Sequence, residues 1–309
     1  MKKVLVTGAA GSIGIQVIKF LLSEGKYEIT ALDLRNKKVL KRLRKYRKRI
    51  NIIYGDVTDS VLIEALIKDH DIVIHLASVM PPMGDFSQKI GEITDYNGTE
   101  NIIKAINYYN NNCFLIYAST TSLYDSTLTA NTKEKVKESE LSSYSLNKYK
   151  TENLIKKKLK NYTIFRVPLV LNEIEKEPFM YNVKKNLVVE VTTSTDAAYA
   201  FVKAINYKKE LNKKIFNIGM GVDGRVKYND ILKNILKNYG LSWKYVLSRI
   251  FLEKTYKSPI LTDSDDLEDI IHYRTDSIYN YYKRLQRKGK NRSINKLLAK
   301  PLLYLKNKE

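Results

Sequence analysis

Thr7-Gly8-Ala9-Ala10-Gly11-Ser12-Ile13-Gly14 follows directly after an apolar run at residues 4–6, and apolar side chains then recur at helical spacing through residues 13–21. Glycine lets the chain turn sharply, lets backbone N–H groups approach phosphate oxygens and lets a helix pack closely on a strand. The helix N-terminus adds partial positive charge. The pattern predicts a strand, turn and helix that bind a dinucleotide pyrophosphate, with the contacts made by Gly8, Gly11, Ser12, Ile13 and Gly14.

A second predicted strand at residues 27–32 ends in Asp33, which lies 19 residues after Gly14. An acidic side chain at this distance can accept hydrogen bonds from the ribose hydroxyls of adenosine. Asp33 therefore favours NAD as the cofactor, because a carboxylate repels a 2′-phosphate. Arg35, Lys37 and Lys38 follow closely and could neutralise that carboxylate, so the sequence leaves NADP open.

The composition places the chain among ordinary globular proteins. It has 309 residues, 44% of them apolar, which is enough for one large domain or two modest ones with a substantial core. A single cysteine excludes an internal disulfide, and no Cys/His cluster suggests a metal. No apolar run is long enough to span a bilayer, and the N-terminal run is too short for a signal peptide. We expect a cytoplasmic protein without a metal site.

The net charge of +21 is unusually high and is concentrated in two segments. Residues 37–49 carry nine basic residues and no acid, and residues 283–309 carry ten basic residues and one acid. Such an excess favours anionic partners such as nucleotides, nucleic acid or acidic lipid. In the first segment Val39, Leu43, Tyr46 and Ile50 recur at helical spacing, which predicts a docked helix with solvated cations. The tail is interpreted as a packed C-terminal element or as a weak contact with an anionic membrane surface.

Further strands are predicted at residues 51–54, 71–75 and 114–118, with helices at 60–68 and 90–109 between them. This alternation predicts an α/β fold of the Rossmann type, a doubly wound parallel sheet with its chemistry at the carboxyl ends of the strands. Asp56 follows the third strand, where a carboxylate could accept from the adenine amino group or serve a simple turn. His75 is interpreted as a structural residue at the end of the fourth strand. The small segment Leu76-Ala77-Ser78 would let a cofactor pass over the sheet.

Tyr144 and Lys148 lie four residues apart in a helix predicted from residue 143 to about 160, so they share a face. A cation beside a phenol lowers the pKa of the phenol from its usual value of about 10. A phenolate can take the proton of a secondary alcohol while a hydride leaves. The Tyr-x-x-x-Lys spacing is weak evidence alone, but here it follows both the glycine-rich turn and a strand that ends in Ser and Thr residues.

Together these motifs resemble the extended short-chain dehydrogenases/reductases of the NAD-dependent epimerase/dehydratase family. The matching segments are the glycine-rich turn, Asp33, Asp56-Val57, His75-Leu76-Ala77-Ser78, Gly98-Thr99, residues 119–124, Tyr144 with Lys148, Arg166-Val167-Pro168, Thr195-Asp196-Ala197-Ala198 and Phe216-Asn217-Ile218-Gly219. The resemblance implies cofactor contacts by Asp56, Val57, Leu76, Ala77, Ser78, Tyr144 and Lys148. It also implies a catalytic trio: Thr120 binds the reacting oxygen, Tyr144 is the acid/base, and Lys148 binds the nicotinamide ribose and tunes Tyr144.

Several positions depart from the family. Dehydratases of this family have Asp-Glu after the Thr and decarboxylases keep the Glu, whereas Thr121 and Ser122 stand here, so epimerisation or carbonyl reduction is favoured. Asp95 replaces the usual Asn of the Asn-x-x-Gly-Thr segment. Leu169 stands where an Asn usually grips the substrate diphosphate, a loss that Lys184, Lys185 or Arg225 could offset.

We expect residues 1–170 and 186–220 to form an NAD-binding Rossmann domain, and residues 171–185 and 221–309 a substrate lobe. Strands are predicted at residues 188–191 and 214–218, a helix at 196–207, and a solvated loop for the acidic cluster at 263–269. The leading hypothesis is an NAD-dependent epimerase or reductase of a nucleotide-linked sugar, acting as a homodimer without nucleic acid. The alternatives are an NAD(P)-dependent reductase of another small carbonyl compound, and a non-catalytic NAD-binding protein that docks on anionic surfaces.

Overall fold

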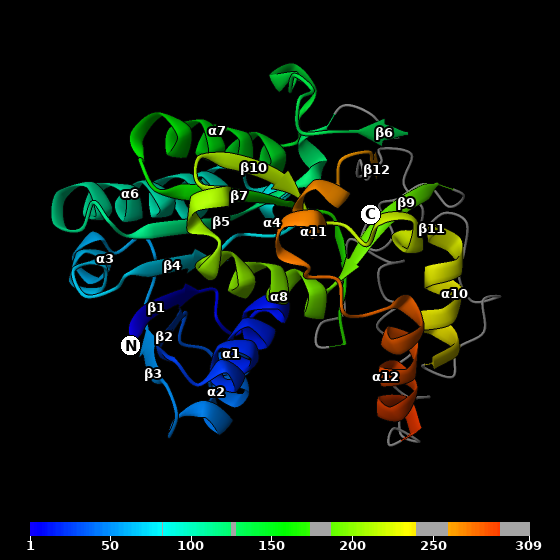
Figure 1. The fold of residues 1–309 in the computed structure, drawn as a ribbon, viewed down its shortest axis with the longest axis horizontal. Coiled ribbons are helices and arrows are strands. Elements are labelled where there is room, and N and C mark those ends of the chain that lie inside the picture. The colour runs from blue at the N-terminus through cyan, green and yellow to red at the C-terminus, as the bar shows by residue number, and fades with distance from the viewer. Residues whose placement is uncertain (82, 125–127, 174–186, 239–258, 291–309) are drawn as a thin grey trace.

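A seven-stranded parallel sheet forms the centre of the molecule in the computed structural model, which describes residues 1–81, 83–124, 128–173, 187–238 and 259–290 (Figure 1). The strands run in the order β10-β7-β5-β4-β1-β2-β3. Their bounds are β1 (Lys2–Thr7), β2 (Tyr27–Asp33), β3 (Asn51–Tyr54), β4 (Ile72–His75), β5 (Phe114–Thr120), β7 (Tyr162–Val167) and β10 (Lys214–Asn217). The strand order reverses between β1 and β4, which confirms the predicted Rossmann-type sheet. In sheets of this kind ligands bind at the point where the strand order reverses.

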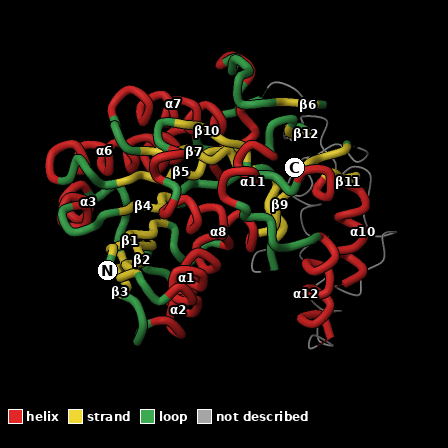
Figure 2. The backbone as a smooth tube through the Cα atoms, viewed as in Figure 1, coloured by secondary structure: helices red, strands yellow, loops and turns green. Residues whose placement is uncertain are grey.

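Helices cover both faces of the sheet (Figure 2). One face carries α1 (Ser12–Glu24), α2 (Lys37–Leu43) and α8 (Ser194–Lys203), and the other carries α3 (Ser60–Ile67), α6 (Gly98–Tyr109) and α7 (Ser143–Lys158). Alternation along the strands explains the two layers: Val4 and Val6 pack into the first core, and Leu5 packs into the second. Strands buried on both faces are continuous apolar runs, as parallel strands are.

The basic segment forms the predicted docked helix. α2 continues into a 3₁₀ turn, η1 (Arg44–Tyr46), and Val39, Leu43 and Tyr46 are buried against the first core while Ile50 packs against it in part. Most of the cations between them are exposed. The apolar stripe therefore fixes this helix on the sheet, as its spacing predicts.

The helix predicted over residues 90–109 is interrupted. α5 (Gln88–Gly91) passes into a π-helical segment, η2 (Glu92–Asn97), before α6 begins at Gly98. Just before it, α4 (Met83–Phe86) packs against α7. Periodicity alone predicted one continuous helix, because a π turn leaves no pattern in apolar spacing.

A smaller group of elements lies beside the sheet, with its own apolar core. It contains a three-stranded sheet in the order β11-β9-β8 and two helices, with the bounds β8 (Leu169–Leu171), β9 (Val188–Thr193), β11 (Arg225–Lys227), α10 (Tyr228–Asn238) and α12 (Ile278–Lys290). Nearby, β6 (Thr129–Ala130) pairs with β12 (Ile260–Leu261), and the described residues also form the short helices α9 (Lys208–Leu211) and α11 (Asp265–Ile271).

The acidic cluster at residues 263–269 is not the solvated loop that we expected. Much of it forms α11, which buries Leu267 and Ile271 against the first core. Its acids also have partners: Asp263 accepts from the backbone N–H and hydroxyl of Thr132, each at 2.7 Å. The prediction failed because charge dominated the local composition, while two apolar residues four positions apart decided the packing. None of the described helices is long and apolar enough to cross a membrane.

Candidate active site

The turn after β1 has the geometry that its glycines predict. Gly8 has φ +64°, and a Cβ there would lie 2.8 Å from the backbone N of Ala77. A Cβ on Gly14 would lie 2.5 Å from the carbonyl oxygen of Gly8. Gly11 caps α1 without a side-chain hydrogen bond, so the first N–H groups of α1 point out of the helix end. The missing Cβ atoms let the turn pack closely against itself and against residues 76–77, and the N-terminus of α1 beside it fits a pyrophosphate.

Asp33 ties this turn to the end of β2. Its Oδ2 accepts from the N–H of Ala10 at 2.8 Å, and its Oδ1 accepts from the N–H of Leu34 at 2.8 Å. Burial raises the pKa of Asp33, while these two donors and the cations Arg42 and Lys38 act in the opposite direction. Carboxylate oxygens have further acceptor capacity, so Asp33 fits a ribose hydroxyl.

Five other predicted cofactor contacts, at residues 56–57 and 76–78, follow the ends of β3 and β4. Asp56 Oδ1 accepts from the N–H of Thr58 at 2.9 Å, which is the turn role that we considered as its alternative. Val57 is buried and leaves no room for a Cβ on Gly98, whose Cβ would lie 2.6 Å from Val57 Cγ2. The segment Leu76-Ala77-Ser78 is partly exposed and runs directly past Gly8.

His75 is a structural residue in this fold. Its Nδ1 lies 2.6 Å from Thr7 Oγ1 and its Nε2 lies 2.9 Å from Thr99 Oγ1. Because Thr99 Oγ1 donates its proton to the carbonyl of Asp95, it must accept from Nε2–H. Burial lowers the pKa of His75 to about 3, so the ring is neutral and links the glycine-rich turn to the π-helical segment.

The predicted catalytic residues lie on two elements that pack together, Thr120 at the end of β5 and Tyr144 with Lys148 on α7. Thr120 ends β5 and is buried, with its Oγ1 donating to Ser122 Oγ at 3.1 Å. Lys148 Nζ donates to the carbonyl of Ala118 on the same strand at 3.0 Å and lies 6.0 Å from the ring centre of Tyr144. Tyr144 is 3% exposed, and its hydroxyl lies 3.6 Å from Met80 Sδ. The arrangement holds a phenol and an ammonium side by side.

Three nearby groups were not assigned a role from the sequence. Met80 contacts the Tyr144 hydroxyl, and Asp85 Oδ1 accepts from the Tyr144 N–H at 3.1 Å. Asp95 lies 3.7 Å from Lys148 Nζ. Only Asp95 left a signal in the sequence, as a departure from the family pattern.

Behind the trio, Glu152 and Arg166 form a buried ion pair. Arg166 Nε donates to Glu152 Oε1 at 3.0 Å, and Arg166 Nη2 donates to Oε2 at 2.7 Å. Ser119 Oγ donates to the same carboxylate at 2.6 Å. The pair clamps α7 to β5 and β7, which fixes the position of the helix that carries Tyr144 and Lys148.

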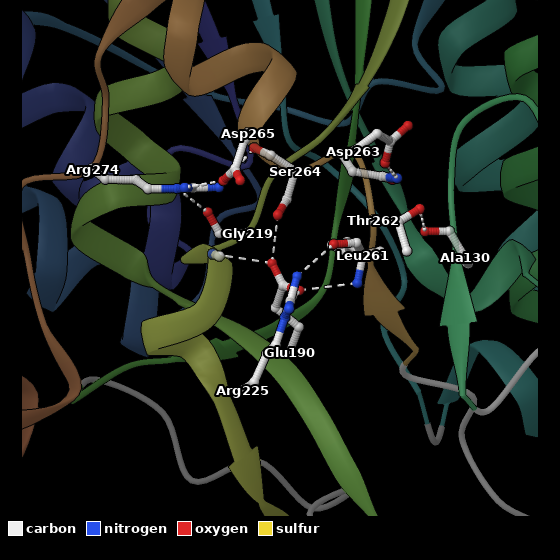
Figure 3. A network of polar contacts seen from close by, with 12 residues as sticks. Ala130, Glu190, Gly219, Arg225, Leu261, Thr262, Asp263, Ser264, Asp265 and Arg274 are labelled. Carbon is white, nitrogen blue, oxygen red and sulfur yellow. Dashed lines mark hydrogen bonds and ion pairs between the residues drawn. The ribbon is translucent and has the colours of Figure 1, made fainter.

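In the smaller lobe, Glu190 organises a second buried network (Figure 3). Its carboxylate accepts from the N–H of Gly221 at 3.1 Å, the N–H of Leu261 at 3.0 Å and the hydroxyl of Ser264 at 2.7 Å. Arg225 Nε donates to Glu190 Oε2 at 3.3 Å, so this cation joins β9 to β11. Three cations could offset the loss of the Asn that Leu169 replaces. Of these, Arg225 is bonded to Glu190, and Lys184 and Lys185 lie outside the described residues. In the described part of the chain, no three His, Cys, Asp or Glu side chains gather as a metal site requires.

Fold and site define a Rossmann-type protein with a glycine-rich turn and a Tyr-Lys pair. The chain matches the 3-beta hydroxysteroid dehydrogenase/isomerase family over residues 5–165 and belongs to that family. This confirms the resemblance to the wider group of NAD-dependent epimerases and dehydratases.

Two relatives and one solved structure illustrate the likeness. CDP-paratose 2-epimerase from Salmonella typhi is 31% identical over 133 residues, and UDP-N-acetyl-alpha-D-glucosaminuronate decarboxylase from Bacillus cytotoxicus is 31% identical over 124 residues. Each match covers 40% of this chain and only 38% of the relative. The UDP-glucuronic acid 4-epimerase from Bacillus cereus, solved with NAD, has a TM-score of 0.73 and 21% identity over 92% of this chain and 99% of that one. At this identity the structural likeness supports the fold.

Proposed function

We propose that this protein is an NAD-dependent epimerase or reductase that acts at a secondary alcohol or ketone of a nucleotide-linked sugar. The observation that carries the proposal is the buried Lys148 ammonium 6.0 Å from the Tyr144 ring, beside the strand that ends in Thr120. The proposed division of labour places the cofactor on residues 1–170 and 186–220, and the substrate on residues 171–185 and 221–309.

The proposed cofactor residues are Gly8, Gly11, Ser12, Ile13, Gly14, Asp33, Asp56, Val57, Leu76, Ala77 and Ser78, together with Tyr144 and Lys148. NAD supplies the hydride acceptor when it is bound. The glycine-rich turn and the open end of α1 would bind the pyrophosphate, and Asp33 would bind the adenosine ribose. The NAD named in the B. cereus structure supports the choice of cofactor.

In this proposal, side chains of the protein transfer the proton. Thr120 would hydrogen-bond the reacting oxygen, and Tyr144 would take the hydroxyl proton of the alcohol and return it to the ketone. The positive charge of Lys148 favours the phenolate form of Tyr144. Thr121 and Ser122 do not titrate near neutral pH, so these two positions do not supply the second acid and base that elimination requires.

Replacing Tyr144 with Phe tests the mechanism. We expect Y144F to lose at least about 100-fold in turnover, because general acid/base catalysis contributes on that order. NADH binding, measured by its fluorescence, should persist because the glycine-rich turn is unchanged. Tyr149→Phe on the same helix is the matched control and should retain turnover. Unchanged turnover in Y144F would refute the assignment.

A second candidate substrate is an apolar secondary alcohol. The thioether of Met80 beside the Tyr144 hydroxyl is the observation that favours it, because it presents an apolar surface at the proposed reacting group. The family to which the chain belongs is named for hydroxysteroid oxidation. Thermal shifts in the presence of NAD, with UDP- and CDP-linked sugars compared with a 3β-hydroxysteroid, would distinguish the two classes.

A further inference from the structure

Asp95 and Lys148 are two opposite charges that are both withdrawn from water. Asp95 is 1% exposed and Lys148 is 2% exposed, and Lys148 Nζ lies 3.7 Å from Asp95 Oδ1. Burying a charge costs several kcal/mol unless an opposite charge or hydrogen bonds compensate. Burial raises the pKa of Asp95 and lowers the pKa of Lys148, and each of the two groups acts against the shift of the other.

The backbone holds Asp95 firmly in this position. It lies in the π-helical segment η2, and such segments occur often at functional sites. The carbonyl of Asp95 accepts from Thr99 Oγ1 at 2.6 Å and from Thr151 Oγ1 on α7 at 3.5 Å. Through Thr99 the segment is also bonded to His75 on β4. The backbone of Asp95 is thus anchored to both the sheet and the helix that carries Lys148, while its two buried carboxylate oxygens accept no hydrogen bond from the described residues.

The other titratable groups around Lys148 are either neutral or already committed. On β4, His75 is neutral, and on β5 the ring centre of Tyr117 lies 4.9 Å from Lys148 Nζ, with burial holding the pKa of its hydroxyl well above the usual value. On α7, Glu152 is bonded to Arg166 and Ser119.

On α4, Asp85 accepts from the Tyr144 backbone. Asp95 is therefore the carboxylate placed to balance the ammonium.

We propose that Asp95 is a positioning residue that keeps the Lys148 ammonium protonated and fixed beside Tyr144. The family usually has an Asn at this position. An Asn carries no charge, so it could not favour the protonated form of Lys148. Burial lowers the pKa of Lys148 and Asp95 acts against that effect, which agrees with the geometry. The role of Lys148 in catalysis rests on the proposed function. The effect of Asp95 on the protonation of Lys148 does not rest on it.

The test is a pH titration of Lys148 in the whole protein without substrate. Lysine ¹³Cε labelling would report the ammonium by NMR, with its signal assigned by its loss in K148R. In Asp95→Asn we expect the titration midpoint of Lys148 to fall by at least about one pH unit, the effect of an opposite charge at this distance. The alkaline limb of kcat/KM should move to lower pH with it. Asp85→Asn removes a carboxylate that accepts from the Tyr144 N–H, and it should shift the midpoint less because the groups that raise the pKa of Lys148 are Asp95 and Glu152.

Asp95→Ser keeps the test open should D95N not fold, because the smaller side chain leaves room for water and still removes the charge. An unchanged Lys148 midpoint in both variants would overturn the proposal. The Lys148 midpoint could fall in the variants while the wild-type protein shows no NAD-dependent turnover. That result would support the pairing of Asp95 with Lys148 and refute the proposed function.

Discussion

The edge of the central sheet at which the strands end has two halves, and different kinds of groups form them. The glycine-loop half, at β1, β2 and α1, is made of backbone, with three glycines whose missing Cβ atoms let neighbouring backbone segments approach closely. The lysine half, at β4, β5 and α7, is made of buried charged side chains: Asp95 with Lys148, and Glu152 with Arg166. The conformation of the glycine-rich backbone depends on local sequence. The free energy of a buried charge depends on partners that are distant in the chain.

The largest expected effect concerns the stability of the lysine half. Replacing Glu152 with Gln leaves the Arg166 guanidinium buried without its counter-charge, and breaking such a pair costs about 3–5 kcal/mol of unfolding free energy. Urea denaturation measures this. Glu100→Gln, which breaks the exposed pair with Lys104 on α6, is the control and should cost about 0.5 kcal/mol or less. Equal losses in the two variants would contradict the contrast between the halves.

The next effect concerns binding in the glycine-loop half. A Cβ on Gly14 would meet the Gly8 carbonyl oxygen at 2.5 Å, so G14A must displace backbone. Overpacking of this kind costs about 1–3 kcal/mol, which predicts an NADH affinity lower by about 10- to 100-fold.

Gly11→Ala is the matched control for that experiment. Its Cβ would meet one atom at 3.1 Å, and its backbone already has φ −65°. G11A should therefore weaken NADH binding less than G14A does. If G11A weakened binding as much as G14A, backbone crowding would not be the cause.

The smallest effect is expected for the cation that braces the glycine-rich turn. Arg42 Nη1 donates to the carbonyl of Ala10 at 2.8 Å, and a hydrogen bond from a charged group is worth about 1.5–3 kcal/mol when fully buried. Because Arg42 is only partly buried, we expect R42A to weaken NADH binding by about 5-fold, measured by fluorescence titration. Lys41→Ala removes the same charge from an exposed neighbour, so a similar loss in K41A would assign the effect to overall charge.

Local patterns predicted the elements of the sheet well, because each depends on residues close in sequence. The strand at residues 51–54 has the predicted bounds, and the apolar spacing of Val39 and Leu43 predicted the docked basic helix. The helix predicted at residues 60–68 is α3, and Asp59 caps it by accepting from the N–H of Leu62. The π turn at residues 92–97 and the helix α11 were missed, since neither follows from regular apolar spacing.

By itself the sequence determined the Rossmann-type fold, the glycine-rich turn and the candidate Thr120, Tyr144 and Lys148. The fold, the turn and the pairing of Tyr144 with Lys148 follow from glycine positions, apolar periodicity and helical spacing, which are short-range properties of the chain, whereas Thr120 follows from the resemblance to the family. Only the tertiary structure decided which partners the buried charges have. It placed Asp95 beside Lys148 and Arg225 on Glu190, because the free energy of a buried charge depends on which groups the completed fold brings within a few ångströms of it.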